Sequence, residues 1–257
     1  VHTLVLDEAD RMLDMGFIRD VRRIIAQVPK QRQTLLFSAT MPDAVAELAQ
    51  SILHDCVRIE VTPAASTVTR VEQRVLFVAR ADKPRLLAEL LKDRAVGRAI
   101  VFTRTKHGAN RVAEHLRRRG VNADAIHGNK SQGARQRVLA GFRSGTLHTL
   151  VATDIAARGI DVDGITHVIN FDLPNEPESY VHRIGRTARA EADGVALSLC
   201  DAEEVAYLRA IEKTIRRSVP VDEDHAYHAA VIVTRQAPSA AGARSFGGGR
   251  HRRRLPR

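Results

Sequence analysis

Three carboxylates, Asp7, Glu8 and Asp10, stand within four positions directly behind the apolar run Leu4–Leu6. Like charges repel, and a carboxylate beside an apolar core is costly unless something cationic meets it. Paired carboxylates behind a strand are a common way to hold Mg²⁺ and to orient the water that attacks a phosphoryl group. A solvated turn with acidic residues at a helix N-terminus explains the same letters. The cluster alone leaves both interpretations open.

Apolar runs typical of strands alternate with helical patterns along most of the chain. The runs predict strands over 1–6, 34–38, 57–61, 71–79, 99–103, 121–126, 149–153, 167–171 and 195–200. The helical patterns cover 10–28, begin at Pro42, at Asp82, after a Ser131 cap and near Pro177, and extend over 106–119, where Gly120 stops the helix, and 203–215. Strands and helices that alternate in this way predict an α/β fold with right-handed crossovers and parallel sheets.

The same pattern divides the chain into two α/β lobes. We expect a short first lobe over residues 1–62, a small and polar linker over 63–71, a second lobe over 72–218 and a tail over 219–257. From Ala229 onward the tail has seven arginines and no acidic residue, among many Gly, Ala, Ser and Pro residues. This composition predicts a disordered basic tail that tethers RNA, or a merely solubilising end.

Charge and cysteine content limit the class of protein. A formal charge of +10 favours a polyanionic partner, most often nucleic acid. Cys56 and Cys200 are far apart and match no metal-binding or redox spacing, which predicts a reducing, cytoplasmic location. No apolar run approaches the roughly 18 residues of a membrane span, so no membrane contact is predicted.

Several polar residues fall directly after predicted strands. Besides Asp7 and Glu8, these are Ser38, Thr40 and Thr153. Parallel α/β sheets bind their ligands at the carboxyl ends of the strands. The coincidence therefore favours a functional interpretation of the acidic cluster.

A second constellation supplies cations. Arg183, Arg186 and Arg189 stand at three-residue intervals, a spacing that predicts one face of a helix. Arginines can stabilise the charge on a phosphoryl group during its transfer. A solvated basic stripe is the alternative interpretation.

Five stretches occur in the order and spacing of DEAD-box RNA helicases. They are DEAD (7–10), SAT (38–40), VFTRTK (101–106), VATDIAARGIDV (151–162) and YVHRIGRTARA (180–190). FTRTKHGANR and HRIGRTARA further resemble the bacterial RhlE-like branch of that family. The resemblance implies two RecA-like parallel-sheet lobes, the first incomplete, followed by the basic tail.

The resemblance implies roles for the matching residues of the first lobe. Asp7 resembles the carboxylate associated with Mg²⁺, and Glu8 the residue that activates the hydrolytic water. Asp10, Ser38 and Thr40 resemble the network that couples hydrolysis to strand separation.

In the second lobe the resemblance implies catalytic and nucleotide-binding roles. His182 corresponds to a residue that approaches the coupling network from this lobe. Arg186 and Arg189 resemble arginine fingers, which meet the γ-phosphate when the lobes close. Gly159 and Asp161 match positions that contact the nucleotide ribose.

The remaining matches concern RNA. Thr103, Arg104, Gln132, Arg135 and Thr153 match positions near the RNA backbone in the second lobe, although a surface charge also explains Arg135. Contacts to phosphate and sugar carry no sequence information, so the implied RNA binding is sequence-tolerant.

One family motif is absent. The phosphate-binding pattern G-x-x-x-x-G-K-[ST] occurs nowhere in the 257 residues, and the resemblance places it upstream of DEAD. We therefore expect an N-terminally truncated helicase whose isolated chain lacks ATPase activity. Ala188 is a smaller departure, since many members have Gly there.

The resemblance thus implies an ATP-dependent RNA helicase that uses ATP and Mg²⁺, acts as a monomer and has ribonucleoprotein partners. One alternative is an RNA-binding module without ATPase activity, which the missing phosphate loop favours for the chain by itself. A DNA helicase or chromatin-type ATPase is another, and the SAT, ARGID and HRIGRTAR wording argues against it.

Overall fold

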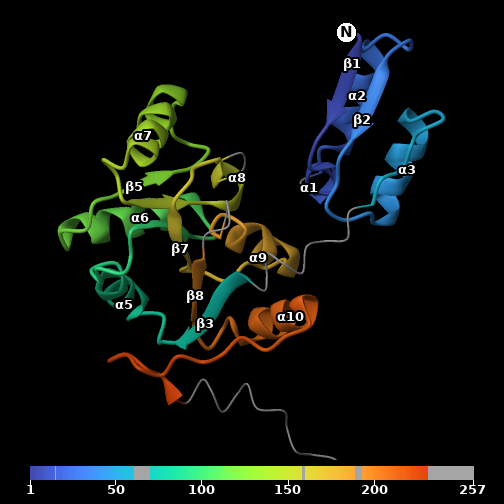
Figure 1. The fold of residues 1–257 in the computed structure, drawn as a ribbon. Coiled ribbons are helices and arrows are strands. Elements are labelled where there is room, and N and C mark those ends of the chain that lie inside the picture. The colour runs from blue at the N-terminus through green and yellow to red at the C-terminus, as the bar shows by residue number, and fades with distance from the viewer. Residues whose placement is uncertain (15, 61–69, 158–159, 189–192, 231–257) are drawn as a thin grey trace, which may run out of the picture. The chain divides into compact units, whose positions relative to one another are not determined.

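A computed structural model describes residues 1–14, 16–60, 70–157, 160–188 and 193–230. The chain divides into two compact units, residues 1–65 and 66–257, which are considered separately (Figure 1). All pairings between strands of the described residues are parallel, which confirms the predicted α/β class. No helix in these described ranges is long and apolar enough to cross a membrane.

The first unit has a two-stranded sheet and three helices. Its elements are β1 (Thr3–Leu6), α1 (Ala9–Asp14), α2 (Ile18–Gln27), β2 (Gln33–Leu36) and α3 (Asp43–Ile52). Leu6, Val21, Leu48 and Ile52 form its main buried cluster, and Ala9 and Val45 are buried as well. This core is small, so we expect the first unit to be the less stable of the two.

The prediction of one helix over 10–28 is wrong, because the segment forms α1 and α2 with a break between them. Gly16 has a φ of +76°, in the left-handed region that glycine adopts without a Cβ clash. The Gly16 N–H donates to the Leu13 carbonyl, and the Phe17 N–H donates to the Met12 carbonyl. This pair of hydrogen bonds is a Schellman motif, which ends α1.

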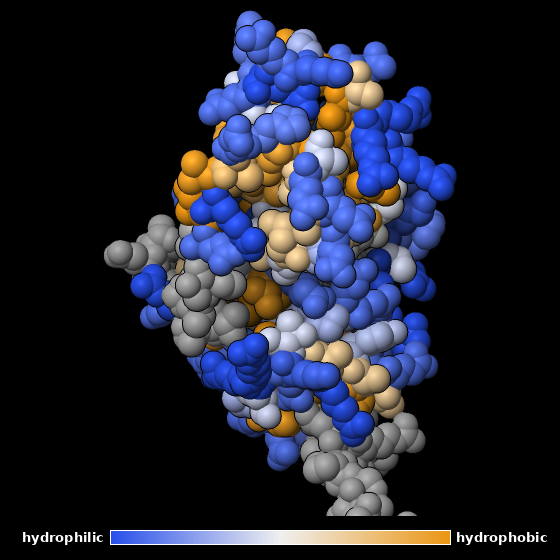
Figure 2. Space-filling view, turned by 90° about the vertical axis from the view of Figure 1, so that its right-hand side faces the viewer, coloured by the Kyte–Doolittle hydropathy of each residue, from blue (hydrophilic) through white to orange (hydrophobic). Residues whose placement is uncertain are grey.

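The predicted strand over 57–61 is also wrong for its described part. Residues 57–60 form no strand, and Val57 and Ile59 are 86% and 81% exposed. An apolar–polar alternation becomes a strand only where a neighbouring strand pairs with it, and none among the described residues does so. Among the described residues, nine of the eleven exposed large apolar side chains belong to this unit. Figure 2 shows such apolar surface as orange patches between blue hydrophilic side chains.

The second unit is built on a six-stranded parallel sheet in the order β3-β8-β7-β4-β6-β5. Its strands are β3 (Val71–Phe77), β4 (Arg98–Phe102), β5 (Ala123–Ile126), β6 (Thr149–Ala152), β7 (Ile165–Asn170) and β8 (Gly194–Cys200). The central strands are buried on both faces, which is why they read as continuous apolar runs rather than as alternations.

Helices cover both faces of this sheet (Figure 1). One face carries α5 (Lys83–Leu90) and α6 (Lys106–Arg118), which pack on Leu76, Val101 and Val151. The other face carries α7 (Gln132–Ser144), α8 (Asp154–Ala157), α9 (Pro177–Ile184) and α10 (Val205–Ile215). Only α8, a helix of four residues, was not predicted from the sequence pattern.

The predicted start of the tail at residue 219 is wrong. Residues 219–230 lie along β3, an edge strand of the sheet. Val75 N–H donates to the Pro220 carbonyl, and Asp222 N–H and Ala229 N–H donate to the carbonyls of Val75 and Phe77. The segment thereby satisfies backbone groups of an edge strand, which composition alone does not reveal. Residues 231–257 and most of the predicted linker, 63–69, lie outside the described residues.

Gly194 gives a first testable prediction. A Cβ at this position would lie 2.3 Å from the Thr187 hydroxyl oxygen and 2.7 Å from the Ala188 backbone nitrogen. Thr187 is buried and its hydroxyl donates to the Ile165 carbonyl, so it has little room to move. Gly194→Ala should therefore lower the free energy of unfolding by about 2–3 kcal/mol, as overpacking does.

The measurement is urea unfolding followed by circular dichroism. Gly133→Ala is the matched control, because nothing lies within 4 Å of its Cβ position on α7. It should be neutral, or should stabilise by up to about 1 kcal/mol. Equal unfolding midpoints for the two variants would contradict the prediction.

Candidate functional site

Asp10, Ser38 and Thr40 meet where β1 and β2 end. These strands are parallel neighbours, so the residues that follow them share one edge of the sheet. The Thr40 backbone N–H and hydroxyl donate to Asp10 Oδ2 at 2.9 and 2.8 Å. The Asp10 N–H donates to Ser38 Oγ at 3.1 Å, and the Ser38 hydroxyl donates to the Thr40 carbonyl at 2.7 Å. The structure thus brings together three residues that the sequence predicted to act together.

The hydrogen bonds keep the buried Asp10 carboxylate charged. Burial by itself would raise the pKa of Asp10, but the hydrogen bonds from Thr40, Arg11 and Ser38 outweigh it and lower the pKa below the ordinary value. Asp10 is therefore the inward-facing member of the acidic cluster, and hydroxyl and N–H donors compensate its charge.

A pH dependence follows from this lowered pKa. The stabilisation by Asp10 is fully present above the unfolded-state pKa of about 3.9 and is lost as the pH falls through the lower folded-state value. At pH 7, Asp10→Asn should lower the free energy of unfolding of the first unit by about 2 kcal/mol, since hydrogen bonds to a charged group are lost. As the pH falls through the lowered folded-state pKa of Asp10, the stabilities of the variant and the unmodified chain should converge.

Thermal unfolding at pH 7, 5 and 3 measures this difference. Asp7→Asn makes the same chemical change on an exposed carboxylate and should shift stability by less than about 0.5 kcal/mol. A difference between Asp10→Asn and the unmodified chain that stays constant with pH would contradict the assignment.

Asp7 and Glu8 occupy the turn between β1 and α1. Asp7 is exposed, and its Oδ1 accepts the Glu8 N–H at 2.9 Å. Glu8 has a φ of +51°, which is uncommon for a residue with a side chain. Its carbonyl accepts the Met12 N–H, so this left-handed residue opens the first turn of α1. Two carboxylates are thereby placed beside the buried Asp10 network.

The donors present suit a metal ion that takes few ligands from the protein. In the described part of the chain no three His, Cys, Asp or Glu side chains are grouped to hold a metal. Mg²⁺ commonly keeps several waters and takes one or two carboxylates together with the phosphates of a substrate. The exposed carboxylate of Asp7 suits such a site, in which one carboxylate, several waters and substrate phosphates surround the ion.

Arg183 and Arg186 do not share a helical face. Helix α9 ends at Ile184, so Arg183 lies inside the helix and Arg186 beyond it. The earlier prediction is wrong because the helix is too short to carry the three-residue spacing onward. Arg189 and Gly159 lie outside the described residues.

Arg183 is a buried cross-link of the second unit. It is 2% exposed. Its Nε and one Nη donate to the two carboxylate oxygens of Asp154 at 2.6 and 2.8 Å, and its other Nη donates to Asn170 Oδ1 and the Asp172 carbonyl. The guanidinium lies 5.0 Å from the centre of the Phe102 ring. These contacts leave it no part in binding a ligand.

Arg186 lies half-buried next to other predicted site residues. Its Nη1 donates to the Ile160 carbonyl at 3.1 Å, and its Nε approaches the His182 carbonyl at 3.4 Å. Ile160 directly precedes the exposed Asp161. The structure therefore gathers Asp161, His182 and Arg186 around the end of α9.

Three helices begin at the carboxyl ends of the adjacent strands β4, β6 and β5. Thr105 caps α6, where its hydroxyl oxygen accepts the Gly108 N–H at 3.0 Å, and Ser131 caps α7 in the same way at 3.3 Å. The N-terminus of a helix carries partial positive charge and unpaired N–H groups, which favour phosphate. Together with the exposed Lys106, these ends give this edge the chemistry that suits a polyanion.

The predicted RNA-binding residues lie at this edge, but not all of them face outward. Thr103 is buried, and its hydroxyl donates to the Thr105 carbonyl. Arg104 is held by side-chain and carbonyl partners within the unit. Gln132 is exposed, while Arg135 and Thr153 are half-buried.

Sequence reasoning missed Thr105 and Lys106, which present exposed groups where α6 begins. The available signal was local, because Thr105 is a preferred N-cap residue directly before a helical pattern.

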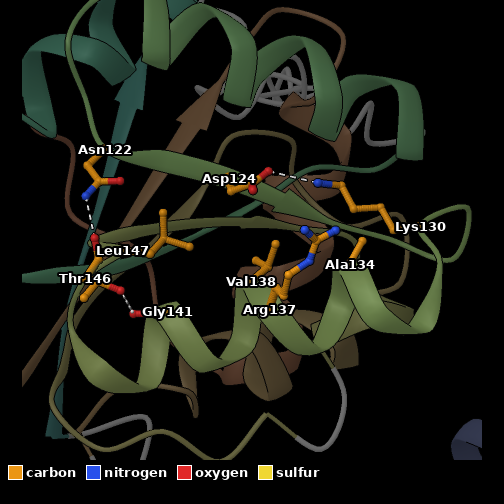
Figure 3. A pocket seen from close by; sticks show the side chains of 9 residues that line it. All are labelled: Asn122, Asp124, Lys130, Ala134, Arg137, Val138, Gly141, Thr146 and Leu147. Carbon is orange, nitrogen blue, oxygen red and sulfur yellow. Dashed lines mark hydrogen bonds and ion pairs between the residues drawn. The ribbon is translucent and has the colours of Figure 1, made fainter.

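A hollow of about 450 Å³ beside β5 and α7 was also missed (Figure 3). The Asp124 carboxylate accepts Lys130 Nζ at 2.9 Å within it. Burial by itself would raise the pKa of Asp124, but Lys130 and backbone N–H donors outweigh it and lower the pKa. The lining carries Lys130 and Arg137 against the one carboxylate of Asp124, so the hollow has a net positive charge.

Comparison with known proteins agrees with this geometry. The family model for the helicase conserved C-terminal domain matches residues 82–191, and the DEAD/DEAH box helicase model matches residues 1–48. The DEAD-box ATP-dependent RNA helicase CshA of Geobacillus kaustophilus is 48% identical over 219 residues, which cover 85% of this chain and 47% of the relative. CshA of Bacillus subtilis is 46% identical, with 85% and 44% covered. The chain thus spans less than half the length of these curated relatives.

Solved structures agree as well. Saccharomyces cerevisiae Dbp5 bound to RNA and ADP BeF3 has a TM-score of 0.79 at 34% identity, over 86% of this chain and 59% of that chain. Escherichia coli SrmB bound to RraA has a TM-score of 0.57 at 37% identity, over 59% of this chain and 90% of that chain. The parallel sheets therefore belong to the RecA-like helicase class. Within it, the chain is a member of the DEAD-box ATP-dependent RNA helicase family.

Proposed function

We propose that this chain acts in ATP-dependent, local opening of RNA duplexes. The observation that carries the proposal is the Asp10–Ser38–Thr40 hydrogen-bond network, with Asp7 and Glu8 on the adjoining turn. A network that spans two strand ends is suited to transmit a change at the carboxylates to the chain beyond β2. This geometry supports the coupling role that the resemblance implies for it.

The nucleotide chemistry is shared between the units in this proposal. Asp7 would hold Mg²⁺, which would supply positive charge beside the ATP phosphates, and Glu8 would orient the attacking water. Asp161 binds the ribose, and Arg186 stabilises the charge on the γ-phosphate. Gly159 binds the ribose together with Asp161, and Arg189 stabilises the γ-phosphate charge together with Arg186. For His182 the proposal keeps the coupling role that the resemblance implies.

RNA binds in this proposal along the edge formed by the starts of α6 and α7. The capped helix ends and Lys106 attract phosphate groups, and Gln132, Arg135 and Thr153 lie at the same edge. Contacts of this kind recognise the backbone, so binding is sequence-tolerant. Assignment to the RhlE-like branch, monomeric action, ribonucleoprotein partners and a cytoplasmic location stay predictions.

The second candidate function is RNA binding without ATPase activity by the chain alone. The absence of G-x-x-x-x-G-K-[ST] from the 257 residues favours it, since that loop's lysine and N–H groups normally hold the β- and γ-phosphates.

One experiment separates the two candidates. ATP and RNA binding are measured for the 257-residue chain and for a version extended upstream through a phosphate-binding loop. RNA binding by both, with ATP hydrolysis only by the extended version, supports the helicase proposal, whereas RNA binding by both with hydrolysis by neither supports the second candidate. ATP hydrolysis by the short chain would show that other residues hold the phosphates. Failure of either version to bind RNA would overturn the proposal.

Lys106 provides a more specific prediction. Lys106→Gln should weaken binding of single-stranded RNA equally for different sequences, and should reduce the slope of log K against log salt by about 0.7. Fluorescence anisotropy titrations at salt concentrations from about 50 to about 200 mM measure both effects.

The matched control for Lys106→Gln is Lys92→Gln. Lys92 is exposed beyond the C-terminus of α5, so it lies toward the opposite edge of the sheet. Removal of its charge should leave the salt slope unchanged. A slope that falls equally for both variants would indicate nonspecific attraction rather than a binding edge.

A further inference from the structure

A cluster of buried charged side chains lies next to the loop that follows β4. Lys83, Asp201 and Glu204 are 1%, 6% and 3% exposed. Lys83 Nζ donates to Glu204 Oε2 and to the Phe171 carbonyl, and it lies 3.2 Å from Asp201 Oδ2. These residues come from α5, from the end of β8 and from the start of α10, so the cluster joins both faces of the sheet.

The other carboxylate oxygen of Glu204, Oε1, faces the loop that leads to the proposed RNA-binding edge at the starts of α6 and α7. Glu204 Oε1 accepts Arg104 Nη2 at 2.7 Å and the Leu173 N–H at 3.1 Å. The same Arg104 nitrogen donates to the Leu173 carbonyl at 3.0 Å, and the guanidinium lies 5.3 Å from the centre of the Tyr207 ring. The Arg104 backbone N–H donates to Asp172 Oδ2 at 2.9 Å. Arg104 is therefore fixed through both its side chain and its backbone.

Stability alone does not account well for such a cluster. Removing charges from water costs several kcal/mol per ion, and apolar residues of similar size often replace a buried ion pair without loss. The cluster does restrain one segment of the backbone that apolar packing would not restrain. It sets the path of residues 103–106, which lead from β4 into the N-terminus of α6.

We propose that Glu204 is a positioning residue for RNA binding: through Arg104 it holds the 103–106 loop so that Thr105, Lys106 and the first turn of α6 face the RNA backbone. The inference rests on the proposed function and deepens it. Arg104 then acts through its hold on the loop rather than through a phosphate contact of its own.

The test compares RNA binding by five chains, with a fluorescent single-stranded oligouridylate as the probe. They are the unmodified chain, Glu204→Gln, Lys83→Met, Arg104→Gln and the double variant Glu204→Gln/Arg104→Gln. Glu204→Gln breaks the ion pair with Arg104. Lys83→Met disturbs the same buried cluster but leaves that pair in place, so it controls for a general loss of stability.

We expect Glu204→Gln and Arg104→Gln each to weaken binding about fivefold, and the double variant to be no weaker, because the two residues act as one unit. Lys83→Met should bind within about twofold of the unmodified chain. The salt slope should stay unchanged in all variants, because no phosphate contact is removed. Circular dichroism checks the fold, and Arg104→Gln, with a partly exposed side chain, keeps the test open if Glu204→Gln unfolds.

Three results would overturn the inference. Unchanged binding by Arg104→Gln removes the positioning role. A salt slope that falls by about 0.7 for Arg104→Gln alone shows a direct phosphate contact instead. Equal losses for Lys83→Met and Glu204→Gln reduce the effect to stability. In each case the unmodified chain still binds RNA, whereas a lack of binding by the unmodified chain would overturn the proposed function as well.

Discussion

Arg183→Ala should lower the free energy of unfolding of the second unit by about 3–5 kcal/mol, the usual loss when one partner of a buried ion pair is removed. The guanidinium makes a two-pronged ion pair with Asp154 and further hydrogen bonds to Asn170 and the Asp172 carbonyl. All of these acceptors lose their donor at once. Urea unfolding followed by circular dichroism measures the loss.

Two control variants make the Arg183 prediction specific. Arg183→Lys keeps the positive charge but not the planar fork, so it should recover only part of the stability. Arg85→Ala breaks an exposed ion pair with Asp82 and should cost less than about 1 kcal/mol. A loss for Arg183→Ala as small as that for Arg85→Ala would show that the buried network is dispensable.

Arg186→Ala should reduce RNA-stimulated ATP hydrolysis by a factor on the order of 10³ or more, the effect of removing an arginine finger. The reason is that a guanidinium stabilises charge that develops on the γ-phosphate only during transfer. RNA binding without nucleotide should stay within about twofold of the unmodified value. The assay uses the upstream-extended version described above.

Arg209→Ala, which removes an exposed arginine from α10, is the control for Arg186→Ala. It should leave the rate of hydrolysis unchanged. Because Arg186 also donates to the Ile160 carbonyl, thermal unfolding of the variant accompanies the assay. Normal turnover in a folded Arg186→Ala protein would remove Arg186 from the catalytic set.

Local sequence signals predicted most of the second unit. Gly120, with a φ of +80°, follows α6 where the pattern placed the end of that helix, and Ser131 caps α7 as predicted. The buried strands read as apolar runs because both faces of the sheet are covered. Signals of this kind depend on neighbours in the chain, so a single sequence contains them.

Errors arose where the decisive partner lies far away in the chain. The strand predicted over 57–61 has the alternation but no paired neighbour in its described part. Residues 219–230 have the composition of a tail, yet they hydrogen-bond to β3 about 145 positions earlier, as the Val75–Pro220 contact shows. Neither outcome depends on the letters of the segment itself.

The sequence by itself determined the α/β class, the order of the elements and the placement of Asp7, Glu8, Ser38 and Thr40 after strands, because periodicity and capping act over a few residues. Only the tertiary structure decided which charged side chains are buried and which reach the surface. Arg183 and Arg186 look alike in HRIGR, but long-range partners bury the first and leave the second half-exposed. The physical reason is that burial and ion pairing depend on residues brought together by the fold, and Glu204 holds Arg104 across a separation of 100 positions.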